Sequence, residues 1–550
     1  MIRPGEMIKK NFFVIDSRHL EDVVTRFYGF SIDEENILNS NEDASVCSFV
    51  PRQQCGAWLY IERTEHEIVI HQDPQGAFGL YLFQANGYFA ISNSFIMLVD
   101  YVKTKYPISM NREVANALLK SSIYSRFIKN TMVNEIVLVS RHERVHIDLK
   151  SKMISMERVN YNDFSVSVNS VEGLTVLDSW VAKWVNIIRR LKAQTNNLSV
   201  DLSGGMDSRV TFMLFLLARV NFLEIKVNSM LSKTHTVFEE DFTIASQIAS
   251  QYDISLNQDV FSLEEIPLQL SDMIDHSVYL KLGFCKQLFF HYTYNMIPIY
   301  GFSGMGGECL RKTWHAIPSE IQTANSDINM LEAYYPDEIL RKEFLVALYR
   351  ETWDRVHFAK TCVEHFLGNV ISAAPLMDAV VRTLSLSSDS CNDPNLLYAI
   401  MYTRYCPKLL DIPFDKGRVL DERLVSYAKK INDIKPFANN YAKLPVQSRK
   451  ADYAEPVAFS AINPSEKPIY SILSCLRKSF DSDMCKDIFL SEFPASIYNE
   501  AGRFADESKF YPLQQVYMVL AVTKILQDVR LSQKIALSTP FSYFSAMCDE

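Results

Sequence analysis

The fold is decided by one segment, Leu198-Ser-Val-Asp-Leu-Ser203-Gly204-Gly205-Met206-Asp207-Ser208. Its apolar start, Leu198 to Leu202, predicts a buried strand. The Ser-Gly-Gly turn leads directly into Val210 to Ala218, which predicts an apolar helix. At such a junction free backbone N–H groups and the positive end of the helix lie at the carboxyl edge of a parallel strand. We therefore expect the turn to bind an anion, above all a phosphate.

The side chains around this turn suit the same ligand. Two adjacent glycines let the backbone approach a phosphate without a Cβ in the way. Ser203 and Ser208 add hydroxyl donors, and Asp207 is a carboxylate of the kind that holds Mg²⁺. No Gly-Lys-Ser/Thr follows, so the turn is not a Walker loop. The alternative is an ordinary strand-to-helix turn that contains a glycine pair.

Glycine is otherwise scarce in the chain. It accounts for 17 of 550 residues, where a soluble protein carries roughly 7%. Six of the 17 lie in two short windows, 204–205 and 301–307. The second window reads Gly301-Phe-Ser-Gly304-Met305-Gly-Gly307-Glu308 and follows a predicted strand at Ile297 to Tyr300. A glycine-poor chain that concentrates glycine in this way is expected to use both windows for function.

Three regions differ in character. Short aromatic and β-branched runs between about 10 and 150 predict an α+β domain. From about 173, strands alternate with helices, as in a parallel sheet with crossover helices. Beyond about 325 helices dominate. We predict domains at 1–165, 173–425 and 426–550, with the polar stretch Asn160 to Glu172 as a linker. The predicted elements are strands Ala57–Ile61, Glu67–His71, Gly79–Phe83, Glu135–Val139, Glu143–Asp148 and Glu224–Val227, and helices Arg112–Lys120, Leu177–Leu191, Asp241–Gln251 and Leu513–Leu526.

Composition excludes several functions. Fifty-six Lys and Arg against 65 Asp and Glu give a net charge of −9, which disfavours a nucleic-acid or anionic-membrane partner. The 10 cysteines form no CxxC pair and no zinc-like cluster. The start of the chain has no signal-peptide pattern, and the most apolar stretch, Val210 to Leu217, is too short to span a bilayer. A cytoplasmic location is expected.

The first window resembles the SGGxDS loop of the PP-loop ATP-pyrophosphatases, which cleave ATP between its α and β phosphates. The second window, about 100 residues later, is similar to a loop of the asparagine synthetase/β-lactam synthetase branch. This resemblance implies ATP and Mg²⁺ as cofactors, with Asp207 and Glu308 as metal ligands. It also implies a set of ATP-binding residues: Val200, Leu202, Ser203, Gly204, Gly205, Met206, Asp207, Ser208, Val227 and Gly304.

Other segments extend the resemblance over about residues 10–425. Glu240-Asp241 looks like the start of the helix after the second strand. Val227 should line the adenine pocket, and Ala374-Pro-Leu-Met-Asp378 resembles a PFLD segment. Ile70 to Tyr81 is similar to a strand pair of class II glutaminase domains. The implied fold is a PP-loop (adenine nucleotide α-hydrolase-like) α/β synthetase domain with a parallel sheet. An Ntn-type, glutaminase-like α+β domain precedes it, and a mainly helical C-terminal region follows.

Two departures from that family change the expected activity. A working class II glutaminase needs cysteine directly after the initiator Met, because its free α-amine assists the thiol, whereas residue 2 here is Ile2. Cys47 and Cys55 are mid-chain and read as core or surface thiols. Glutamine hydrolysis is therefore expected to be absent. Met305 occupies the place where relatives carry Glu or Tyr, which leaves the general base unassigned.

Relatives also use a late lysine to stabilise charge on the adenylate and pyrophosphate. We assign this catalytic role to Lys416, with Arg418 beside it, in the segment Asp411-Ile-Pro-Phe-Asp415-Lys416-Gly417-Arg418. Lys435 and Lys443 are rivals, and Lys416 as a solvated turn residue is the alternative. His315 could contact phosphate, although a lone histidine is more often structural.

The expected function is an ATP-dependent carbon–nitrogen ligase that adenylates a carboxylate, releases pyrophosphate and passes the acyl group to an amine or ammonia. The acceptor is a small molecule, a saccharide or a peptide, and a homodimer is allowed. One alternative is a non-catalytic ATP-binding or scaffold protein. The other is a PP-loop sulfur transferase acting on tRNA, which needs a catalytic cysteine near the loop and a basic face.

Overall fold

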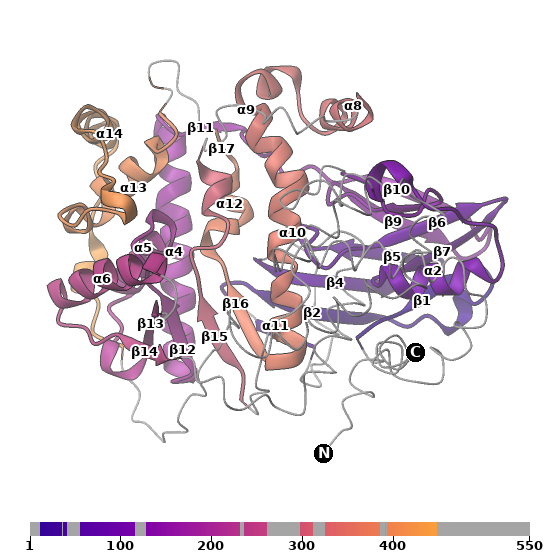
Figure 1. Ribbon diagram of the computed structural model, residues 1–550, viewed down its shortest axis with the longest axis horizontal. Helices are drawn as coiled ribbons and strands as arrows, with labels where there is room; N and C mark the ends of the chain where they lie inside the picture. Colours follow the sequence, from indigo (N-terminus) through magenta and orange to yellow (C-terminus); the bar gives the residue numbers. More distant parts are fainter. Residues whose placement is uncertain are drawn as a thin grey trace.

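The computed structural model describes residues 11–35, 37–40, 55–115, 128–231, 236–260, 297–311, 325–385, 391 and 393–447. Figure 1 shows a mixed α/β molecule, with antiparallel strands of the N-terminal region on one side and a helix-covered parallel sheet on the other. Within the described residues, no helix combines the length and apolarity needed to cross a membrane.

The N-terminal region contains two antiparallel sheets, as the short alternating strands predicted. One has the strand order β10-β9-β5-β4-β2-β3, and the other has the order β1-β7-β6-β8. Leu59 and Ile61 of β4 belong to the main hydrophobic core, while Trp58 and Tyr60 form a small cluster with Phe27 on the opposite face. The strands are β1 Val14–Asp16, β2 Arg26–Ile32, β3 Ile37–Asn39, β4 Cys55–Arg63, β5 Glu67–Gln72, β6 Tyr81–Ala85, β7 Tyr88–Ser92, β8 Ile136–Leu138, β9 Glu143–Asp148 and β10 Ile154–Arg158, with helix α2 at Phe95–Lys103.

The second sheet is parallel and has the strand order β14-β13-β12-β15-β16. The chain runs outward from β12 to β13 and β14, and then returns to the other side of β12 as β15. This reversal of strand order is a topological switch point, where open α/β sheets bind ligands beyond the carboxyl ends of their strands. The strands are β12 Leu198–Asp201, β13 Lys226–Leu231, β14 Asn257–Val260, β15 Ile299–Phe302 and β16 Val370–Ala373.

Long helices enclose this sheet (Figure 1). The predicted apolar side of α4 is buried through Trp180, Trp184, Ile187, Ile188 and Leu191. Helix α11 contacts both β16 and β2, and therefore lies between the parallel sheet and the N-terminal strands. The helices are α4 Val171–Gln194, α5 Met206–Ala218, α6 Thr236–Gln251, α8 Asn325–Tyr334, α9 Asp337–Tyr349, α10 Arg355–Phe358, α11 Lys360–Gly368, α12 Ala379–Arg382, α13 Leu396–Tyr405 and α14 Glu422–Ile434.

The structure departs from the sequence prediction in its strands and in one domain boundary. Strands β14 and β16 were not predicted, and β16 lies in a region expected to be mainly helical. The predicted boundary at 425 falls inside α14, and the backbone of Gln447 still pairs with Arg219 and Asn221, so the unit that contains the parallel sheet extends to 447. The helix at Leu513–Leu526 lies outside the described residues.

The segment predicted as a polar linker is partly buried. It connects the two regions and forms the short strand β11 Val166–Ser167, which pairs with β17 Leu384–Ser385. However, Tyr161, Asp163 and Phe164 are buried. Asp163 is buried because it has arginine partners, which a sequence pattern does not reveal.

Candidate functional site

The two glycine windows meet at the switch point. The loop after β12 and the loop after β15 leave neighbouring strands, since Val200 lies opposite Phe302. A Cβ atom on Gly304 would lie 2.3 Å from the backbone nitrogen of Ser208, and one on Gly307 would lie 2.1 Å from Cγ of Asp207. These two glycines are needed because the loops touch, so the windows form one site.

In the first loop, backbone N–H groups point at oxygen atoms of side chains. Ser203 donates its N–H to Oγ of Ser208 (3.0 Å), and Gly205 donates to Oγ of Ser203 (3.1 Å). Gly204 donates its N–H to a carboxylate, Oδ1 of Asp241, at 2.9 Å. The N–H of Gly204 therefore already has a carboxyl group as its partner.

Asp241 is in an unfavourable environment for a charged carboxyl group. Burial raises its pKa, and the nearby charges of Asp415 and Glu240 raise it further, while the bond from Gly204 opposes the shift. A group held in this way is easier to displace or to neutralise than an ordinary surface aspartate.

The apolar residues assigned to ATP binding lie in the core. Val200, Leu202 and Met206 are buried, as is Val227, which pairs in register with Val200. The carbonyl of Asn228 accepts the N–H of Leu202 at 2.8 Å. These side chains pack in the core next to the loop and do not line its surface. Contact between Val227 and adenine stays a prediction.

Asp207 is bound by two side chains that the sequence did not single out. Oδ2 accepts a bond from Nη2 of Arg311 at 2.6 Å, and Oδ1 contacts the hydroxyl of Tyr398. The same hydroxyl lies 3.1 Å from the carbonyl oxygen of Gly307. Burial raises the pKa of Asp207. Burial, together with the charge of Asp207, raises the pKa of Glu308 to about 7.

A protein cation already neutralises Asp207 in this arrangement, so a divalent cation would have less to gain from that carboxylate. Both of its carboxylate oxygens have a protein partner. In the described part of the chain, no group of three or more His, Cys, Asp or Glu residues is placed to hold a metal. Asp207 and Glu308 lie near enough for the charge of Asp207 to raise the pKa of Glu308, and Arg311 pairs with Asp207. Magnesium binding by these two carboxylates stays a prediction.

The loop that carries Lys416 lies against the first glycine window. Asp415 donates its N–H to the carbonyl oxygen of Gly204 at 2.9 Å, and Lys416 donates its N–H to Oε1 of Glu240 at 2.7 Å. Arg418 pairs with the carboxylate of Asp415. The side chains of Lys416 and Arg418 are exposed.

A buried arginine holds these two loops together. Arg209 of α5 donates to the carbonyls of Leu409 (2.9 Å), Ile412 (2.7 Å) and Pro413 (2.9 Å), and approaches that of Gly204. The rival Lys435 is instead paired with Asp178 at 2.9 Å. Of the other candidates, Lys443 is exposed in a short turn at Asn440–Lys443.

Sequence reasoning missed Arg311, Tyr398 and Arg209. A signal existed for two of them. Arg209 interrupts an apolar helix, which requires a buried partner, and Tyr398 with Tyr402 forms an i, i+4 pair on α13. Tyr402 donates its hydroxyl to the carbonyl of Met206 at 2.5 Å.

The secondary candidates have mixed outcomes. Met305 packs against the hydrophobic core. Cys55 is a core thiol, as expected, and burial raises its pKa to about 12. His315 and Cys47 lie outside the described residues.

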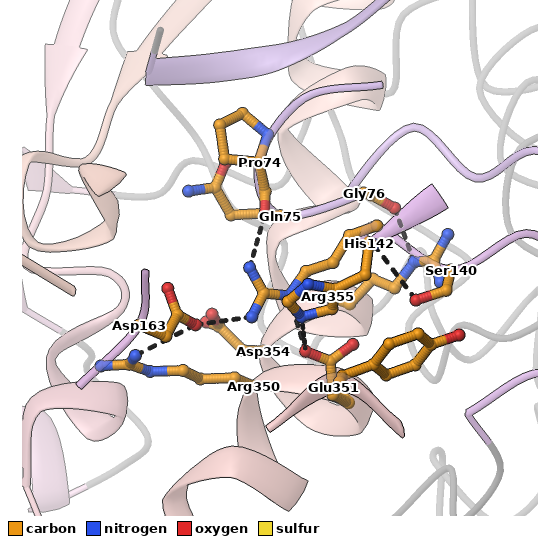
Figure 2. A network of polar contacts seen from close by, with 12 residues as sticks. Pro74, Gln75, Gly76, Ser140, His142, Asp163, Arg350, Glu351, Asp354 and Arg355 are labelled. Carbon is orange, nitrogen blue, oxygen red and sulfur yellow. Dashed lines mark hydrogen bonds and ion pairs between the residues drawn. The ribbon is translucent and has the colours of Figure 1, made fainter. Parts of the chain in front are cut away.

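A buried network of charged side chains contacts the second loop at Cys309. Figure 2 shows Asp163 beside Arg350, and His142 close to Glu351. Arg350 also donates to the carbonyl oxygen of Cys309 at 3.2 Å, next to Glu308. We call this set the arginine network; its members are Arg141, His142, Asp163, Arg350, Glu351, Asp354, Arg355 and Arg382.

The arginine network joins the N-terminal region to the unit that contains the parallel sheet. Arg141, from the N-terminal region, pairs with Glu351 at 2.7 Å and with Asp163 at 2.6 Å. In the other direction, Arg355 donates to the carbonyls of Gly76 and Val139, each at 2.7 Å. The second loop is therefore supported by residues from both regions.

Comparison with known proteins adds little to this geometry. No family model matches the chain, and no curated protein matches it. Among solved structures, a match is found to glutamine phosphoribosylpyrophosphate amidotransferase from B. subtilis, complexed with ADP and GMP. It has 12% identity and a TM-score of 0.12, and covers 39% of this chain and 35% of that chain. The match thus spans about a third of that enzyme, and at this TM-score it carries no argument.

Proposed function

We propose that the protein is an ATP-dependent ligase that forms an amide bond. It would adenylate a substrate carboxylate, release pyrophosphate, and pass the acyl group to an amine or to ammonia, without glutamine hydrolysis. The observation that carries this proposal is the contact between the two glycine windows at the switch point, where Gly204 already donates its N–H to a carboxylate. A loop of this kind, at the start of a helix, suits the phosphate chain of a nucleotide.

The residues of the site have separable roles in this proposal. The backbone and hydroxyls of residues 203–208 hold the phosphate chain, and ATP supplies the α-phosphorus that the substrate carboxylate attacks. Lys416 and Arg418 approach from the loop beside Gly204 and stabilise the charge that develops on the leaving pyrophosphate. Mg²⁺, which the resemblance implies, has no step here because Asp207 already binds Arg311 and Tyr398.

The partners of the reaction follow from its chemistry. A carboxylate on a small molecule, a saccharide or a peptide provides the acyl group, and a free amine or ammonia provides the nitrogen.

The test is pyrophosphate release from ATP by the purified full chain, screened over carboxylates and amines. Asp207→Ala is expected to lower the release at least about 100-fold, because it removes the partner of Arg311 and Tyr398 at the centre of the site. Asp433→Ala, at an exposed position of α14, is the matched control and is expected to leave the rate unchanged. An unchanged rate in Asp207→Ala would refute this mechanism.

A second candidate is a non-catalytic ATP-binding protein. Met305 packs against the core where relatives carry Glu or Tyr, so this loop position supplies no general base. Calorimetric binding of ATP, with no pyrophosphate release on any carboxylate tested, would support it.

A tRNA sulfur transferase needs a reactive thiol near the loop, and Cys309, a described cysteine beside the second glycine window, does not supply one. Cys309 follows Glu308 directly, but it is buried, and burial raises its pKa well above the ordinary range. A thiol that stays protonated is a poor nucleophile.

A further inference from the structure

Arg311 occupies an unusual position. It lies three residues beyond Glu308, and its Nη2 is 2.6 Å from Oδ2 of Asp207. Only 11% of the Arg311 side chain is exposed, and its buried Nε atom has no hydrogen-bond partner among the residues that the structure describes. An unsatisfied N–H on a buried cation is costly, and a ligand can relieve that cost where the side chain is open to one. The Nε atoms of Arg350 and Arg382 are also unpartnered within the described part of the chain, but those side chains are enclosed in the arginine network, whereas Arg311 is partly open.

The guanidinium of Arg311 is fixed in place. Its Cζ atom lies 5.7 Å from the ring centre of Tyr398, whose hydroxyl holds the other oxygen of Asp207. Gly307 packs so closely against Asp207 that a Cβ atom would not fit between them. This close contact holds the second loop, and with it Arg311, beside the carboxylate. A planar guanidinium has five N–H donors, and the bond to Asp207 uses only part of them.

The charges around Arg311 are those that usually surround a bound metal. Asp207 and Glu308 are close enough for the charge of Asp207 to disfavour ionisation of Glu308. A divalent cation would relieve this repulsion and attract phosphate. Arg311 relieves the repulsion through its contact with Asp207. It is also well suited to attract phosphate, because the two parallel N–H groups of a guanidinium match two phosphate oxygens.

We propose that Arg311 takes the place of a divalent cation at Asp207 and binds the phosphate chain of ATP directly. This inference rests on the proposed function, and it specifies how that site holds its nucleotide. Its consequence is that the protein binds the triphosphate in the absence of divalent cations. Asp207 then acts as a positioning residue for Arg311 and not as a metal ligand.

The experiment measures nucleotide binding without turnover. The full chain is titrated by calorimetry with α,β-methylene-ATP, which cannot be cleaved at the α–β bond, in EDTA and in excess Mg²⁺. The wild-type affinity is expected to fall less than about 10-fold in EDTA. Arg311→Met is expected to lose about 10- to 100-fold of the affinity in EDTA, since charge-assisted bonds of this kind have that effect. Arg311→Lys keeps the charge but loses the paired N–H groups of the guanidinium, so its affinity in EDTA should lie between those of wild type and Arg311→Met.

Two controls separate this role from a structural one. Arg144→Met removes an arginine from a surface pair with Glu157 (3.0 Å) and should leave binding unchanged. The double variant Asp207→Asn/Arg311→Met removes both charges, so it leaves no unpaired charge that would prevent folding. Its binding in EDTA should be as weak as that of Arg311→Met, and wild-type affinity in the folded double variant would overturn the inference.

The outcomes also separate the inference from the proposed function. If wild type binds the analogue only with Mg²⁺ and Arg311→Met binds equally well, the inference is wrong and the proposed function stands. If wild type binds the analogue in neither condition, both are wrong. As a second readout, Mn²⁺ titration followed by electron paramagnetic resonance should show a site in Arg311→Met that wild type lacks, and an equal number of sites in both proteins would contradict the inference.

Discussion

The arginine network and the glycine-loop site are both built from carboxylates and arginines, but their charges are balanced differently. In the network, burial alone would raise the pKa of Asp163 and of Glu351, yet the charge of Arg141 lowers both pKa values well below the ordinary range. In the loop site, burial raises the pKa of Asp207 and of Glu308, and Arg311 does not reverse the shift.

This difference indicates what each region does. A buried carboxylate with matched arginines holds one geometry and has little reason to bind anything else. A partly open site whose carboxylates resist ionisation is typical of a place where a ligand completes the charge balance. Asp354 has features of both regions. It belongs to the arginine network, but it approaches Cys309 of the second loop, and burial raises its pKa.

The largest expected effect comes from breaking the balanced region. Arg141→Met removes the cation shared by Asp163 and Glu351, and should lower the free energy of unfolding by about 3–5 kcal/mol. Urea denaturation of the purified chain measures it. Arg144→Met, in a surface pair, should cost less than about 1 kcal/mol. A similar loss of unfolding free energy in the two variants would mean that the arginine network stabilises the fold no more than a surface ion pair does.

A smaller effect on stability, with a larger one on binding, is expected from Gly307→Ala. The new Cβ would lie 2.1 Å from the carboxyl group of Asp207, so the loops must separate, at a cost of about 1–3 kcal/mol. Binding of α,β-methylene-ATP should fall at least about 10-fold, since the contact orients the site.

The matched control for this change is Gly87→Ala. Gly87 has a φ of +76° but open space around it, so the variant should lose about 1–2 kcal/mol from backbone strain and keep its nucleotide affinity. Unchanged affinity in Gly307→Ala would mean that the two loops do not work as one site.

Local patterns predicted those parts of the molecule that depend on local sequence. The strand–turn–helix at 198–218 and the buried side of α4 are found where apolar spacing placed them. The two glycine windows meet in the structure, as the resemblance implied when it paired Asp207 with Glu308. Strand β16, Val370–Ala373, was missed because four small or apolar residues do not distinguish a strand from part of a helix.

Long-range pairing was beyond the reach of the sequence. Tyr398 reaches Asp207 from 191 positions away, and Arg141 meets Glu351 across 210 positions. Such pairs depend on how helices return over the sheet, and a single sequence carries no local signal of that. For the same reason, Asn160 to Glu172 was taken for a linker, since nothing nearby shows that Asp163 has arginine partners.

The smallest expected effect is a pH dependence that has opposite signs in the two regions. The pKa of Glu308 is raised from its ordinary 4.5 to about 7. Well below pH 4.5 this carboxyl is neutral in both the folded and the unfolded chain. As pH rises to 7 and beyond, the unfolded chain ionises first, so stability is lost. Glu308→Gln removes that loss, and should raise the free energy of unfolding by about 1–2 kcal/mol at pH 8, after allowance for partial exposure, and by about zero near pH 4.

Glu351→Gln provides the matched test in the arginine network. Its lowered pKa means that the ionised carboxylate stabilises the folded chain above the ordinary pKa, and that this contribution is lost as pH falls. The variant should therefore be less stable than wild type at pH 8, with a difference that shrinks in acid. Urea denaturation at pH 8 and at the lowest pH where wild type stays folded measures both variants. If the two Glu→Gln changes shift stability in the same direction at pH 8, the two regions do not differ in charge balance as the structure indicates.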